Sequence, residues 1–309
     1  MTISVAAPPT HRMAGLRLRH LKPHPRLRWI PVLICGSLLF AAVLAALLGT
    51  QDILYVPSLL LVGAAVVPIT FLTFVGGLPR RGELSFARIA VAAALGGVIG
   101  TVVAGSVEFE TVRTLGSLPT LGIGLIEESA KLAIPATLLL WRKQRPLDGL
   151  VLGVAVGSGF AALETMGYAF AALVASGGQL DSVTRLLLVR SVTEPGGHAA
   201  WTGLASAALF AIRGSRRRWL GWLRFLLVFA GVVALHATWD SVATDKAYLV
   251  VGGVSFSLLM ATTWRLYHHD SPDRRPSRFA NWRRGRRGLP EQVSPVDVLE
   301  VGAESLMPR

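Results

Sequence analysis

The feature that most constrains this chain is a series of apolar runs, each about as long as a membrane is thick. A helix needs about 20 predominantly apolar residues to cross a hydrocarbon core roughly 30 Å thick. Hydrophobic residues make up 52% of the 309-residue chain and charged residues only 16%, whereas a soluble chain has about 25% charged residues. The sequence therefore predicts an all-α, polytopic transmembrane helix bundle without a soluble catalytic domain.

The apolar runs predict about eight membrane-spanning helices joined by short connections. Their expected ranges are 30–49, 53–76, 86–106, 119–141, 148–175, 197–212, 219–243 and 247–266. Basic connections alternate with acidic or neutral ones: the first set lies near Arg80, Arg142 and Arg213, the second near Asp52, Glu108, Asp181 and Asp245. Basic connections face the cytoplasm, and an even number of spans then places both tails there.

The predicted organisation is a basic cytoplasmic tail over 1–29, the transmembrane bundle over 30–266, and a basic, disordered cytoplasmic tail over 267–309. The formal net charge of +13, taken alone, suggests nucleic-acid binding. However, the basic residues lie beside the spans, where they report orientation and attraction to anionic lipid. We therefore expect the lipid bilayer as a partner and no nucleic acid. The single cysteine, Cys35, excludes a disulfide within the chain.

Ionisable residues interrupt four of the apolar runs. They are Glu127, Glu128 and Lys131 in the fourth span, Glu164 with Tyr168 in the fifth, His198 at the start of the sixth, and His236 with Asp240 at the end of the seventh. A charged side chain at the centre of a membrane helix costs at least about 2.5 kcal/mol, so such residues indicate a functional site.

The expected depths of these residues agree. At 1.5 Å per residue from the cytoplasmic ends, Glu128 lies about 20 Å deep, His198 about 22 Å, Glu164 about 24 Å and His236 about 26 Å. The helices alternate in direction, yet all four residues reach the outer part of the membrane. Their convergence predicts one shared site.

Two histidines and one or two glutamates suit a divalent metal, with zinc expected, and leave a position open for water. The expected ligands are His198 and His236 with Glu164 or Glu128, and the expected catalytic carboxylates are Glu127, Glu128 and Glu164. Which glutamate binds metal and which serves as general base is left open. Lys131, Tyr168 and Asp240 are expected to support the site: Lys131 neutralises a carboxylate on its own helix, and Asp240 holds His236. Arg190 is interpreted as a solvated loop residue.

Four ordered motifs carry a family resemblance. Glu127-Glu128-Ser-Ala-Lys131 is similar to EExxK, and Phe160-Ala-Ala-Leu-Glu164-Thr-Met-Gly-Tyr168 to FxxxExxxY, with Thr165 where many members have Asn. His198-Ala-Ala-Trp201 is similar to a segment in which histidine precedes an aromatic residue, and His236-Ala-Thr-Trp239-Asp240 to HxxWD. Over about residues 119–241 the chain resembles the PrsW family of bacterial intramembrane proteases, and more distantly the CAAX-processing and bacteriocin-processing membrane proteases.

This resemblance implies a metal-dependent endopeptidase in the bacterial inner membrane. Its substrates would be membrane-anchored proteins cut near the outer face, an anti-sigma factor among them. Two alternatives remain from the residues themselves. One is a metal-independent glutamate protease. The other is an ion- or proton-coupled transporter, which also places Glu, His and Lys inside a bundle. The transporter is disfavoured because the polar cluster is confined to the C-terminal half.

Overall fold

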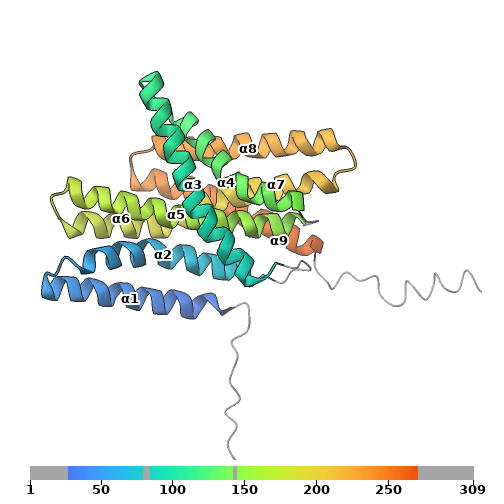
Figure 1. The fold of residues 1–309 in the computed structure, drawn as a ribbon. Coiled ribbons are helices and arrows are strands. Elements are labelled where there is room, and N and C mark those ends of the chain that lie inside the picture. Colours follow the sequence, from blue (N-terminus) through green and yellow to red (C-terminus); the bar gives the residue numbers. More distant parts are fainter. Residues whose placement is uncertain (1–26, 79–83, 142–144, 271–309) are drawn as a thin grey trace, which may run out of the picture.

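The computed structural model describes residues 27–78, 84–141 and 145–270, and all regular structure within these ranges is helical. The longer helices are α1 (Trp29–Thr50), α2 (Tyr55–Gly76), α3 (Phe86–Leu115), α4 (Thr120–Trp141), α5 (Pro146–Ala175), α6 (Leu180–Thr193), α7 (His198–Ala211), α8 (Arg218–Ser241) and α9 (Asp245–Asp270) (Figure 1). Two short 3-10 helices, η2 (Glu194–Gly196) and η3 (Ile212–Gly214), flank α7.

The bundle is polytopic. Six of the described helices, α1, α2, α3, α5, α8 and α9, are long and apolar enough to cross a membrane. Helix α4 has a similar length of 22 residues but carries three charged residues, and α7 has only 14 residues. The prediction of an all-α membrane bundle is confirmed, whereas the count of eight spans and the orientation of the tails stay predictions.

Each expected span contains a helix, but α3 continues well past its expected end at residue 106. The connection predicted around Glu108 is instead helical. Glu110 and Arg113, one turn apart, form an ion pair on its surface, and the helix ends only at Gly116, whose φ of +77° suits glycine. Glu108 therefore lies on a helix near the site.

The sixth expected span is a broken helix, of which the sequence predicted only the second half. The segment around Asp181, expected as a polar connection, forms α6. Both α6 and α7 lie antiparallel to α5, because Arg190 of α6 contacts Glu164 of α5 while Thr202 of α7 lies beside Gly153. Pro195 in η2 and the glycines after it interrupt the helix between the two halves.

Glycines allow α7 to approach α5 closely. A Cβ added to Gly153 would lie 2.7 Å from the Ser206 Cβ, and one added to Gly157 would lie 2.8 Å from the Ala199 Cα. On another face of α5, a Cβ on Gly97 of α3 would lie 2.7 Å from the Gly159 carbonyl oxygen. The α5 glycines therefore serve close helix packing, which fixes the start of α7 against the middle of α5.

The start of α1 and the end of α9 lie at the same end of the bundle (Figure 1). Helix α9 ends at Asp270, so residues 267–270, expected in the C-terminal tail, are helical. The rest of the two basic tails, 1–26 and 271–309, and the basic connections at 79–83 and 142–144 lie outside the described residues.

Candidate active site

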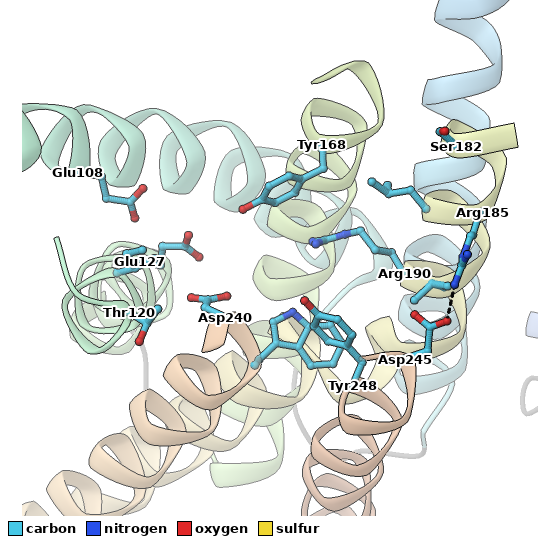
Figure 2. A pocket seen from close by; sticks show the side chains of 14 residues that line it. Glu108, Thr120, Glu127, Tyr168, Ser182, Arg185, Arg190, Asp240, Asp245 and Tyr248 are labelled. Atoms are coloured by element: carbon cyan, nitrogen blue, oxygen red, sulfur yellow. Dashed lines mark hydrogen bonds and ion pairs between the residues drawn. The ribbon is translucent and has the colours of Figure 1, made fainter. Parts of the chain in front are cut away.

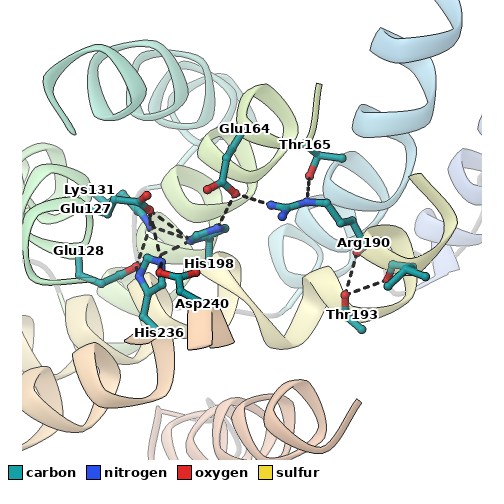
Figure 3. Close-up of polar contacts among 11 residues, drawn as sticks. Glu127, Glu128, Lys131, Glu164, Thr165, Arg190, Thr193, His198, His236 and Asp240 are labelled. Carbon is teal, nitrogen blue, oxygen red and sulfur yellow. Dashed lines mark hydrogen bonds and ion pairs between the residues drawn. The ribbon is translucent and has the colours of Figure 1, made fainter. Parts of the chain in front are cut away.

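The structure brings seven of the eight predicted site residues into one polar cluster (Figure 3). Helix α4 contributes Glu127, Glu128 and Lys131, α5 contributes Glu164, α7 contributes His198, and α8 contributes His236 and Asp240. Glu128 and Lys131 are completely buried, and His198 and His236 are at most 3% exposed. The eighth residue, Tyr168, lies on the wall of the neighbouring cavity.

Lys131 is the central cation of the cluster. Its Nζ donates to Glu127 Oε2 at 3.0 Å, to Glu128 Oε1 at 2.7 Å and to His198 Nδ1 at 2.7 Å. It also lies 4.0 Å from the ring centroid of Phe160. The predicted ion pair on its own helix is confirmed, and the bond to His198 extends it to α7.

The partners of His198 define its tautomer. An ammonium only donates, so Nδ1, which accepts from Lys131, carries no proton. Nε2 then donates to Glu164 Oε2 at 2.8 Å. Glu164 also accepts from Arg190 Nη2. Glu164 therefore holds the His198 ring by its outer nitrogen, as a carboxylate does behind a metal-binding histidine.

His236 is held in a similar way. Its Nδ1 donates to Glu128 Oε1 at 3.1 Å, while Nε2 lies 3.5 Å from both Glu127 Oε2 and Asp240 Oδ2. The ring stacks on Trp201 with centroids 4.6 Å apart. Sequence spacing assigned the orienting role to Asp240, but Glu128 makes the shorter contact and Asp240 faces the other nitrogen.

Both oxygens of Glu128 are occupied. Oε1 accepts from Lys131 and His236, and Oε2 accepts from the Thr202 hydroxyl at 3.2 Å. The geometry therefore favours Glu128 as an orienting residue over the expected metal ligand or base. Glu127 differs, because its side chain lines the cavity.

The donor set fits a divalent cation. Glu127, His198 and His236 offer three ligand atoms within 4.8 Å of one another, whereas ligand atoms around tetrahedral zinc lie about 3.3 Å apart, so small side-chain shifts would close the group. Both imidazoles are held by a carboxylate on one nitrogen, and their other nitrogens, His198 Nδ1 and His236 Nε2, lie 4.0 Å and 3.5 Å from Glu127 Oε2. Lys131 contacts both Glu127 and His198, so a cation held by these residues would compete with its ammonium group.

Arg190 is not a solvated loop residue, which corrects the interpretation from sequence. Its side chain is 16% exposed and forms an ion pair with Glu164, and its Nε donates to the Thr165 hydroxyl at 2.7 Å. Its guanidinium lies 4.8 Å from the Tyr168 ring centroid. The side chain is held inward because α6 is a helix packed on α5.

A cavity of about 680 Å³ adjoins the cluster (Figure 2). Glu127 and Asp240 line it on the side of the cluster, and Ser182, Asp245 and Tyr248 line it near the starts of α6 and α9. The cavity thus lies at the end of the bundle where α3 joins α4, α5 joins α6 and α8 joins α9. It is large enough for a ligand and gives Glu127 a route to a substrate.

Two residues that line the cavity were not predicted from the sequence as part of the site. Glu108 was placed in a connection, although it follows Gly100 and Ala104 at the four-residue spacing of the buried face of α3. Arg190 was placed in a loop because the 14-residue α6 contains charged residues and is too short to span a membrane.

A buried pair of histidines beside a carboxylate that lines a cavity, all within a membrane helix bundle, is the arrangement expected of an intramembrane metallopeptidase. The family model described as PrsW family intramembrane metalloprotease matches residues 83–265, a wider segment than the expected 119–241. The chain belongs to this family and is a multi-pass membrane peptidase, which sets the transporter alternative aside. Searches of curated proteins and of solved structures gave no significant match.

Proposed function

We propose that the protein is a metal-dependent endopeptidase of the bacterial inner membrane that cuts membrane-anchored proteins near the outer face. Glu127, His198 and His236 hold the metal, with zinc as the proposed ion. The observation that carries this proposal is the paired orientation of the imidazoles: Glu164 holds His198 and Glu128 holds His236, which leaves His198 Nδ1 and His236 Nε2 at 4.0 Å and 3.5 Å from Glu127 Oε2.

A divalent cation held by Glu127, His198 and His236 would polarise the scissile carbonyl and lower the pKa of a water molecule in the site. Asp240 is the proposed general base, because it lines the cavity and contacts no basic side chain other than His236 among the described residues. It accepts a proton from the attacking water and returns it to the leaving amine. This role differs from the expectation that one of the glutamates is the base.

The position of the cavity supports cleavage near the outer face. It lies at the end of the bundle that carries the α5–α6 and α8–α9 connections, and these lack the arginine clusters found around Arg213. By the positive-inside rule this end faces away from the cytoplasm. An anti-sigma factor as the natural substrate stays a prediction from the family resemblance.

The test of these roles compares Asp240→Asn with His198→Ala in a purified protein cutting a membrane-anchored reporter. Loss of a general base costs about 10²–10⁴-fold in rate, so Asp240→Asn is expected to bind metal normally and to cut at least 100-fold more slowly. His198→Ala is expected to lose both properties. Asp52→Asn, on the exposed α1–α2 connection, is the matched control.

Wild-type turnover in Asp240→Asn would remove that residue from the base role. Full cleavage by a metal-free wild type in the presence of chelators would instead favour the metal-independent glutamate mechanism.

A further inference from the structure

Most of the charged side chains that line the cavity face a partner of opposite charge or a basic side chain, but one does not. Its two guanidiniums are both engaged: Arg190 pairs with Glu164, and Arg185 Nη2 lies 2.9 Å from Asp245 Oδ2. Of the other lining carboxylates, Glu127 pairs with Lys131, and Asp240 faces His236. The remaining one is Glu108.

Glu108 has no hydrogen-bond or ion-pair partner within the described part of the chain, and its Oε1 is shielded from solvent. Figure 2 shows Glu108 of α3 and Glu127 of α4 projecting into the cavity from the same side. Glu108 as a whole is half-buried. A carboxylate oxygen that is shielded from water without a partner is unfavourable, so a donor that enters the cavity would satisfy Oε1.

The walls favour a cationic donor over a neutral one. Four carboxylates and two guanidiniums line the cavity, and both guanidiniums are already paired. Trp239 and Tyr248, whose ring centroids lie 4.7 Å apart, provide aromatic surface, along which the apolar stem of a long basic side chain can pack. An acidic substrate side chain would meet repulsion at Glu108.

We propose that Glu108 is a specificity-determining residue that binds a lysine or arginine side chain of the substrate close to the scissile bond. The substrate class is thereby a membrane-anchored protein with a basic residue at the outer edge of its span. This inference rests on the proposed function and deepens it.

The test uses single-span reporter proteins with Lys, Gln or Glu placed in turn at each position along the outer edge of the span. The reporters are reconstituted with the purified full-length enzyme in proteoliposomes, and kcat and KM are measured separately. A hydrogen bond to a charged group changes affinity by about tenfold or more. At the best position, the wild type should therefore prefer Lys over Gln by at least about tenfold in kcat/KM, mainly through KM.

In Glu108→Gln the Lys/Gln preference ratio should fall to near one, and in Glu108→Lys the Glu reporter should become the preferred one. The ratio does not depend on how much of a variant folds, since an unfolded fraction lowers both rates alike. Glu110→Gln is the matched control: Glu110 lies on the same helix with 56% side-chain exposure and pairs with Arg113, so the preference should persist.

A wild type that cuts all reporters equally would overturn the inference, as would a Glu108→Gln variant that keeps the Lys preference. Either result leaves the proposed function intact if His198→Ala is inactive on every reporter. Cleavage by His198→Ala at the wild-type rate would instead refute the proposed function itself.

Discussion

Glu164 gives the sharpest test of how the site is built. The sequence predicts it as a metal ligand, whereas in the structure it is the hydrogen-bond partner of His198, a proposed metal ligand. Its Oε2 accepts from His198 Nε2 at 2.8 Å and from Arg190. Glu164→Gln keeps the shape and one acceptor oxygen but removes the charge. Loss of such a partner weakens metal affinity by about 10–100-fold, which corresponds to roughly 1.4–2.7 kcal/mol.

The assay is a competition titration of the detergent-purified protein with a chromophoric chelator, which reports affinity and stoichiometry together. Glu164→Gln is expected to bind one equivalent of metal with an affinity lowered by about 10–100-fold. His198→Ala should bind none. Glu110→Gln should match the wild type, because Glu110 is exposed and pairs with Arg113 rather than with a residue of the site.

Loss of stoichiometric binding in Glu164→Gln, equal to the loss in His198→Ala, would show that Glu164 is itself a ligand. An unchanged affinity would show that its bond to His198 does not prepare the site. The first result would refute the assignment of Glu127 as the carboxylate ligand. The second result would refute the assignment of Glu164 as the orienting residue.

Three further perturbations have expected outcomes. Gly157→Val should lower the free energy of unfolding by about 1–3 kcal/mol, because its side chain overlaps the start of α7, whereas Gly167→Ala, with open space around it, should be neutral or stabilising by about 0.5–1 kcal/mol; thermal melts compare them, and equal melts would contradict the packing. Arg190→Met should lower the free energy of unfolding by about 3 kcal/mol, which is the low end for a broken buried ion pair because both side chains are 16% exposed. An unchanged melting temperature would show that the ion pair does not stabilise the fold. In a variant without the native cysteine, Asp181→Cys should react with an impermeant thiol reagent in intact cells and Arg213→Cys only after permeabilisation; the reverse pattern would invert the topology.

Much of the fold was predictable from the sequence because an apolar run of about 20 residues has few alternatives to a membrane helix. All eight expected spans contain helices. Helix α6 was missed because hydropathy recognises whole spans, and its 14 residues include Asp181, Arg185 and Arg190. The break at Pro195 marked where a helix stops, but not that another helix precedes it.

The members of the polar cluster were also predictable, since ionisable residues at one depth on several helices must find partners. Their roles were not. Glu127 and Glu128 are neighbours in sequence and differ by about 100° around the helix axis, and only the packing of α4 against α8 shows which faces the cavity. Likewise, the ring nitrogen that a histidine offers depends on its rotamer and its second partner, which spacing along one helix does not give.

The central claim is that Glu127, His198 and His236 form a metal site. The most direct test is the metal content of the gently purified, full-length protein, measured by elemental mass spectrometry beside a His198→Ala/His236→Ala double variant. About one equivalent of a divalent metal is expected in the wild type and none in the variant. A wild type that contains no metal and takes up none when zinc is added would contradict the assignment of this metal site.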